Sequence, residues 1–170
     1  LTGSGKELSG GMSGTVQVVK NPDGSFIIKE QGGPVEVGGM APDFEVELVG
    51  GSKVRMSDLR GKVVLLNFWA TWCGPCQREL REVQKEILDR FAGEDFVFLP
   101  ISRGEEKAKV LEFRKTNNYT FPMGLDPETK VFPLFAEQGI PRSYVINRDG
   151  TIASMELGYN PEKGFADIIA

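Results

Sequence analysis

The chain has 170 residues, of which 40% are hydrophobic, and a formal net charge of −4 at pH 7. This length suits one domain with a sizeable core. The charge excludes the strongly basic surface that binds nucleic acids or anionic membranes. No apolar run approaches the roughly 20 residues that a membrane-spanning helix needs. The chain starts at Leu1 and shows no signal peptide, so we expect a processed or recloned mature form.

The first part of the chain differs in composition from the rest. Residues 1–14 are rich in Gly and Ser without an apolar period, which predicts a flexible tether or a remnant of cloning. Two β-rich runs within 15–30 flank Asn21-Pro-Asp-Gly24, a pattern typical of a β-hairpin. An isolated hairpin is marginally stable in water, so we expect it to pack on the main domain as a sheet extension rather than to form a substrate-binding arm. With a glycine-rich connector the extension spans 15–37, and residues 38–170 form the main domain.

The stretch from Lys62 to Leu80 contains the chemistry of the chain. Residues 63–69 are mainly apolar, which is typical of a short buried strand. The two cysteines of the chain, Cys73 and Cys76, follow this run. The next segment has a helical period, and its apolar side is formed by Cys76, Leu80, Val83, Ile87 and Phe91. The sequence therefore predicts a strand, a tight turn and a helix, with the thiols at the turn.

This placement gives the two cysteines different roles. Cys73 lies at or before the first helical turn, where unpaired backbone N–H groups and the helix dipole favour a thiolate. Its pKa should therefore fall below the free value of about 8.5. Pro75 suits the first helical turn, and Gly74 keeps the approach to Cys73 open. Cys76 lies on the apolar side and should be less exposed, so Cys73 is placed to attack and Cys76 to close a reversible disulfide.

Structural explanations of the cysteine pair are weaker. A structural zinc site needs four ligands, and the chain has two cysteines and no histidine, so carboxylates would have to complete the site. A purely structural disulfide would close so short a loop that it would stabilise the fold little. Redox chemistry is therefore favoured, with no metal and no other cofactor expected.

The remaining segments predict an α/β fold. Further strands are expected at 44–48, 53–56, 96–101, 143–147 and 151–156, the last two as a hairpin. Helices are expected over about 104–117, in a short segment ending at Gln138, and from Asn160. Ser102 and Glu105 have the capping-box spacing that would begin the first of these helices. Asp126 before Pro127 has the pattern of another helix start, and Pro133 interrupts that segment.

Several motifs resemble one family of proteins. Residues 68–76, Phe-Trp-Ala-Thr-Trp-Cys-Gly-Pro-Cys, resemble the active-site segment of thioredoxin-fold proteins. The wider pattern is similar to the TlpA/ResA type of extracytoplasmic thiol–disulfide oxidoreductase, related to the AhpC/TSA group. The matching pieces, in the family's order, are 39–44, 59–62, the WCGPC stretch, 121–122 and 139–147. The resemblance covers about residues 38–158. It implies a thioredoxin-like fold, with a central mixed β-sheet flanked by helices, and a dithiol–disulfide cycle between Cys73 and Cys76.

Ile140-Pro141 is the second expected site. A proline before a buried strand is usually an ordinary trans strand start. The resemblance implies a cis-proline opposite the CxxC helix, because thioredoxin-fold proteins carry one at this position. A cis bond would leave the Ile140 backbone facing Cys73, where an extended substrate could add as a strand. Trp72 offers a flat contact to a peptide, although fold packing explains it equally well. The expected substrate contacts are Trp72, Gly74, Pro75, Ile140 and Pro141.

Glu79 is the third expected site residue. It lies one helical turn after Cys76, near the edge of the same face. A partly buried carboxylate there would have a raised pKa and could relay a proton to or from Cys76; the alternative is a solvated surface glutamate. The family often carries a glutamate here. Two departures from the family matter: Asn67 replaces a buried aspartate of thioredoxin and should bond only locally, and Arg81 lies where relatives often have a kinking proline, so a straighter helix is expected.

These features predict a protein-disulfide reductase. Reduced Cys73 attacks a partner's disulfide, and Cys76 resolves the mixed disulfide. The Gly-Pro dipeptide resembles that of thioredoxin, a reductant near −270 mV. Three alternatives remain: an oxidase or isomerase on the same fold, a non-catalytic binding module, and a peroxiredoxin-like peroxidase. The segment Ala41–Phe44 suggests the peroxidase, but its Thr-x-x-Cys setting is missing because Thr71 is only two residues before Cys73.

The resemblance also implies where the protein acts. It suggests an extracytoplasmic location, in the periplasm or anchored to a membrane through the N-terminus, although a redox cysteine pair alone fits the cytosol equally. The expected partners are protein disulfides and an upstream thiol electron donor, without nucleic acid. We expect a monomer.

Overall fold

The computed structural model describes residues 15–20, 22–31 and 35–169. The expected tether and Asn21 of the hairpin turn lie outside these ranges. The two β-rich runs form the antiparallel strands β1 (Thr15–Lys20) and β2 (Phe26–Gln31), which confirms the predicted hairpin. This hairpin is a two-stranded sheet of its own, and its packing on the main domain stays a prediction.

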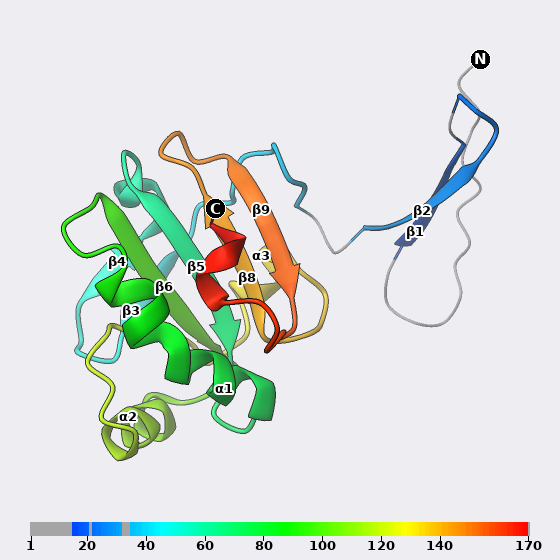
Figure 1. Ribbon diagram of the computed structural model, residues 1–170. Coiled ribbons are helices and arrows are strands. Elements are labelled where there is room, and N and C mark those ends of the chain that lie inside the picture. Colours follow the sequence, from blue (N-terminus) through cyan, green and yellow to red (C-terminus); the bar gives the residue numbers. More distant parts are fainter. Residues whose placement is uncertain (1–14, 21, 32–34, 170) are drawn as a thin grey trace.

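Seven strands form one mixed sheet in the order β4-β3-β7-β6-β5-β8-β9 (Figure 1). The strands are β3 (Glu45–Leu48), β4 (Lys53–Arg55), β5 (Val63–Trp69), β6 (Phe96–Arg103), β7 (Gly124–Asp126), β8 (Arg142–Ile146) and β9 (Ile152–Leu157). Strands β5, β6 and β7 are parallel, whereas β8 and β9 form the predicted hairpin on the other side of β5. The cysteine-bearing turn therefore follows a strand with neighbours on both sides, which holds the start of that turn in place.

Helices cover both faces of this sheet. Along β5, Leu65 and Trp69 pack into one hydrophobic cluster, whereas Val64, Leu66 and Phe68 pack into the other. The first cluster contains buried side chains of α1 (Gly74–Val83), η2 (Gln84–Asp89), α2 (Lys107–Thr116) and η3 (Phe165–Ile168). The second contains side chains of η1 (Met56–Leu59) and α3 (Phe132–Phe135), and Figure 1 shows α3 behind the sheet with α1 and α2 in front. This arrangement confirms the predicted α/β class with a mixed sheet flanked by helices.

The helix after the cysteines has the predicted apolar side. Leu80, Val83 and Ile87 are all buried. The regular helix ends at Val83, however, and continues as a π-helical segment, η2. This π-helical segment was not predicted from the sequence. The absence of proline at Arg81 indicated only a straighter helix, and a π-helical segment can form without proline.

The predicted capping box is wrong. Ser102 pairs with Trp69 of β5 and with Leu125 of β7, so β6 extends to Arg103 instead of ending at residue 101. Helix α2 begins only at Lys107, and its N-cap residue makes no side-chain capping bond. The tertiary pairing of Ser102 in the sheet replaces the local capping that the spacing indicated.

The predicted helix start at Asp126 is also only partly right. Asp126 is the last residue of a strand, β7, that the sequence analysis missed. Its buried carboxylate accepts hydrogen bonds from the backbone N–H groups of Lys130, Val131 and Phe132. Asp126 therefore binds the backbone N–H groups at the start of the short helix α3, and it does not cap a helix that begins at residue 127.

The end of the chain departs from prediction in a similar way. The side chain of Asn160 accepts a hydrogen bond from the backbone N–H of Glu162, which closes a turn. The expected helix does not begin there, since the helical residues start at Phe165 in η3. None of the helices in the described ranges combines the length and hydropathy needed to cross a membrane.

Candidate active site

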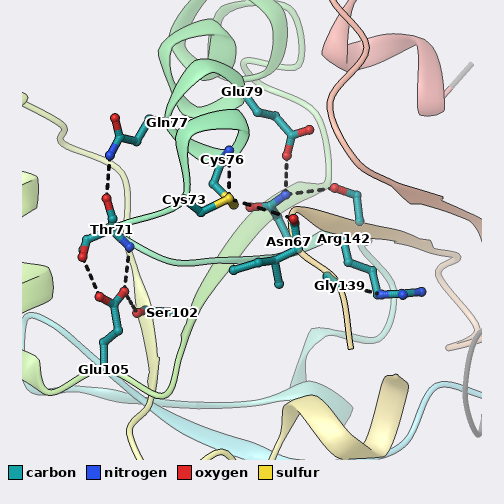
Figure 2. The surroundings of a disulfide bond; sticks show 12 residues. Asn67, Thr71, Cys73, Cys76, Gln77, Glu79, Ser102, Glu105, Gly139 and Arg142 are labelled. Carbon is teal, nitrogen blue, oxygen red and sulfur yellow. Dashed lines mark hydrogen bonds between the residues drawn. A yellow bond between two sulfur atoms is a disulfide. The ribbon is translucent and has the colours of Figure 1, made fainter. Parts of the chain in front are cut away.

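The two cysteines lie where β5 turns into α1 and are joined by a disulfide (Figure 2). Cys73 is the N-cap residue of α1 and has an extended backbone, and its sulfur accepts the backbone N–H of Cys76 at 3.3 Å. Cys73 is 5% exposed and Cys76 is 0% exposed, so the first sulfur is the nearer to solvent. Trp72 (67% exposed), Gly74 and Pro75 surround it on the surface. The helix N-terminus thus offers a backbone donor to the outer sulfur.

The loop before β8 forms the opposite wall of the site. The Ile140–Pro141 peptide bond is cis, and the carbonyl oxygen of Ile140 lies 3.9 Å from the Cys73 sulfur. Arg142 is buried, and its guanidinium donates to the carbonyl oxygens of Gln138 (2.7 Å) and Gly139 (3.3 Å). The role of this arginine was not predicted, because nothing in the local pattern of residues indicates that its side chain turns back onto its own loop.

Gly139 is required where it lies in this loop. Its φ is +97°, a left-handed conformation that side chains rarely adopt. A Cβ at this position would also approach Cδ1 of Leu157 to 2.9 Å. The glycine therefore allows the chain to turn beside β9 immediately before Ile140.

Glu79 is buried on α1, so the solvated-surface alternative is wrong. Its Oε1 accepts a hydrogen bond from the Asn67 side-chain amide at 2.6 Å. Desolvation raises the pKa of Glu79 to about 8; the Asn67 hydrogen bond opposes this rise, and the nearby carboxylates of Glu156 and Glu82 add to it. Glu79 therefore gains or loses a proton within the pH range in which thiols ionise.

Asn67 connects three elements rather than bonding only locally, as the sequence analysis expected. Its amide nitrogen donates to Glu79 on α1 (Figure 2) and also to the hydroxyl of Ser143 on β8, at 2.9 Å. Its oxygen Oδ1 is buried and has no partner within the described residues. As an amide it orients the Glu79 carboxylate by donating to it.

A second buried glutamate, Glu105, contacts the segment just before Cys73. Its carboxylate accepts hydrogen bonds from the backbone N–H and the hydroxyl of Thr71, at 2.7 and 2.5 Å, and from the hydroxyl of Ser102 at 2.8 Å. From the sequence, Glu105 was predicted only as a helix-capping residue. Its position just after the carboxyl end of a parallel strand, where ligand sites of open α/β sheets gather, is a signal that could have found it.

Comparisons with known proteins agree with this geometry. The AhpC/TSA family model matches residues 37–155. The chain is 31% identical to the thiol-disulfide oxidoreductase ResA of Bacillus cereus over 135 residues, which is 79% of this chain and 76% of that protein. The chain belongs to the AhpC/TSA family. Its disulfide-linked CxxC pair and its ResA relatives make it a thiol–disulfide oxidoreductase of that family.

Solved structures of similar proteins have the same fold. A putative protein disulfide isomerase from Bacteroides thetaiotaomicron superposes with a TM-score of 0.74 at 41% identity, covering 79% of this chain and 86% of that one. A putative thiol:disulfide interchange protein DsbE from Chlorobium tepidum gives a TM-score of 0.70 at 27% identity, covering 76% and 90%. These matches confirm the thioredoxin-like fold.

Thr71 is relevant to the peroxidase alternative within the AhpC/TSA family. Its hydroxyl donates to Glu105 rather than to the cysteine sulfur. The side chain that would have to assist a peroxidatic thiol is therefore already bound elsewhere.

Proposed function

We propose that this protein reduces disulfide bonds of extracytoplasmic proteins through a Cys73/Cys76 dithiol–disulfide cycle. One observation carries the proposal: the outer sulfur lies at a helix N-terminus, above a fully buried partner sulfur and 3.9 Å from the Ile140 carbonyl. A thiolate of Cys73 is stabilised by the backbone N–H of Cys76 and by the helix dipole. This cysteine is therefore the attacking group.

The cycle proceeds in two exchanges. The Cys73 thiolate attacks one sulfur of the substrate disulfide; a Cys73–substrate bond forms, the substrate S–S bond breaks, and the leaving sulfur takes up a proton. Cys76 then loses its proton and attacks Cys73, which releases the second substrate sulfur as a thiol and leaves the Cys73–Cys76 disulfide. An upstream dithiol donor returns the two electrons.

Glu79 is proposed as the proton relay for Cys76. It lies one turn along α1 from Cys76, is buried, and has a pKa of about 8, close to that of a thiol. A carboxylate with such a pKa can accept the Cys76 proton when this cysteine attacks and can return it in the reverse direction.

The substrate contacts are proposed to be Trp72, Gly74, Pro75, Ile140 and Pro141. The first three are exposed beside Cys73, and the Ile140 carbonyl faces the same sulfur. An extended segment of the substrate would bind along Ile140 by main-chain hydrogen bonds, with its cysteine directed at Cys73.

The proposed location is supported by a relative, and the proposed direction by the dipeptide between the cysteines. The solved relatives include an exposed lipoprotein thioredoxin of Streptococcus pneumoniae, 29% identical to this chain, with a TM-score of 0.63 and coverage of 75% and 95%. This supports an extracytoplasmic protein, with a membrane tether through the N-terminus. The Gly-Pro dipeptide supports a potential near the −270 mV of thioredoxin, and a value near −120 mV would assign oxidation instead.

Insulin reduction tests the proposal. The wild-type protein with dithiothreitol should reduce insulin, Cys73→Ser should abolish turnover, and Cys76→Ser should accumulate a mixed disulfide. A wild-type rate no faster than that of dithiothreitol alone would favour the binding-module alternative. Peroxide consumption tests the peroxidase alternative, and refolding of a scrambled protein tests the isomerase.

A further inference from the structure

The cysteine turn is held by a buried group that the exchange reaction itself does not use. Glu105 is 5% exposed and follows β6, whereas the cysteines follow β5. Figure 2 shows its carboxylate directed at Thr71, with Glu79 beyond the cysteines. Its two oxygens receive the Thr71 N–H and hydroxyl and the Ser102 hydroxyl, and Lys109 lies 3.5 Å away as an ion-pair partner. Its hydrogen bonds thus tie the cysteine turn to the end of the neighbouring strand.

Every polar group of Thr71 is engaged. The N–H and hydroxyl donate to Glu105, and the carbonyl oxygen accepts a hydrogen bond from the Gln77 side chain at 2.5 Å. Gln77 belongs to α1, so Thr71 is fixed between the end of β6 and the helix that carries Cys76. Hydrogen bonds to an ionised acceptor are among the stronger ones, and a buried donor without a partner is costly.

The residue after Thr71 is the exposed Trp72, and Cys73 follows. An indole that is 67% exposed gains little fixation from packing, so its orientation depends on the backbone that precedes it. Ordering a loop and its side chains on binding reduces affinity, so a turn that is fixed beforehand matters most for a substrate that must contact both Trp72 and Cys73.

The geometry points to Glu105 as a positioning residue: its carboxylate holds Thr71 so that Trp72 and Cys73 together receive a polypeptide disulfide. This inference rests on the proposed reductase function. A small disulfide that needs only the Cys73 sulfur depends little on the orientation of Trp72. The role of Glu105 is therefore in the binding of protein substrates and not in the exchange step.

The test compares two substrates and two variants. With insulin, Glu105→Leu should raise KM about tenfold with kcat little changed, while the rate with 5,5′-dithiobis(2-nitrobenzoate) stays within about twofold. Glu105→Gln should retain most activity with both substrates, because an amide oxygen can still accept from the Thr71 N–H and the amide NH2 can donate to the Thr71 hydroxyl. The Asp126→Asn variant is the control, since Asp126 is another buried carboxylate but bonds to residues 130–132.

If Glu105→Leu does not fold, the insulin KM of Thr71→Val tests the inference instead. This variant keeps the backbone N–H and removes one hydrogen bond, so a smaller rise of the insulin KM is expected. Equal losses on both substrates, equal damage by Gln and Leu, or unchanged insulin kinetics in both Glu105→Leu and Thr71→Val would overturn the inference. If the wild type itself does not exceed the Cys73→Ser baseline on insulin, it is the proposed function that fails.

Discussion

The regions around Glu79 and Glu105 contain the same residue type at the same exposure, 5%, in two different environments. Desolvation raises the pKa of Glu79 to about 8; the nearby carboxylates of Glu156 and Glu82 add to this rise, and the single hydrogen bond from the Asn67 amide only partly opposes it. Glu105 receives three hydrogen bonds and the Lys109 ion pair. Burial alone therefore does not decide what a carboxylate does. The donors and charges around Glu105 make it an anchor of the cysteine turn, a role for which Glu79 lacks the partners.

The largest expected difference between these regions is in stability. Glu105→Leu leaves Thr71 and Ser102 donors without their acceptor and should lower the free energy of unfolding by about 3 kcal/mol. Glu79→Leu removes one acceptor of the Asn67 amide, and this amide still donates to Ser143. The loss in free energy of unfolding at pH 8 should therefore be much smaller than for Glu105→Leu. Urea unfolding of the oxidised proteins measures both. Equal losses would show that the two environments do not differ in the way described.

The pH dependence of stability should differ next. The folded-state pKa of Glu79 is about 8 and its ordinary value is 4.5, so the folded state binds more protons than the unfolded state between these pH values. Its contribution to stability is complete below about pH 4.5 and is lost as the pH rises through 8, at a rate of about 1.4 kcal/mol per pH unit within this window. Glu79→Gln should lack this slope. Unfolding curves from pH 6 to 9 test this, and parallel wild-type and variant curves would contradict it.

The rate of thiol–disulfide exchange should also depend on the titration of Glu79. If Glu79 relays the Cys76 proton, the rate of thiol–disulfide exchange should contain a step near pH 8 that Glu79→Gln removes. Stopped-flow rates of insulin or small-disulfide reduction across pH 6–10 measure it. Glu105→Gln is the matched control and should keep the step. A Glu79→Gln profile that superposes on the wild-type profile would remove the relay role.

Asn67 should influence this step through its hydrogen bond. Because this bond lowers the pKa of Glu79, Asn67→Ala should move the Glu79 titration to higher pH. Carboxyl chemical shifts of the oxidised protein report the titration directly. A downward movement would mean that water entering the vacated space outweighs the lost hydrogen bond.

The smallest expected effect comes from Glu156. Its charge raises the pKa of Glu79 less than burial does, so Glu156→Gln should lower that pKa only slightly. The same carboxyl titration detects it, and a low-salt buffer should enlarge the difference because screening weakens the interaction between the two charges. If the pKa of Glu79 does not change in Glu156→Gln at low salt, the charge effect on this pKa comes from Glu82 and not from Glu156.

The sequence by itself determined the strand, turn and helix around Cys73 and Cys76, the hairpin β8–β9 and the α/β class. These features depend on residue periods and on turn residues that act within a few positions of the chain, so they can be predicted locally. The motif order also identified the family.

Only the tertiary structure decided the roles of Glu105, Asn67, Asp126 and Arg142. Ser102 and Glu105 have the spacing of a helix cap. Ser102 instead pairs with β5 in the sheet, and Glu105 accepts a hydrogen bond from Thr71, 34 positions away in the sequence. Asn67 meets Glu79 and Ser143 across 12 and 76 positions of sequence. A polar side chain that becomes buried must bond with whatever donors and acceptors the packed fold brings to it, and those partners are set by the three-dimensional contacts and not by neighbouring residues.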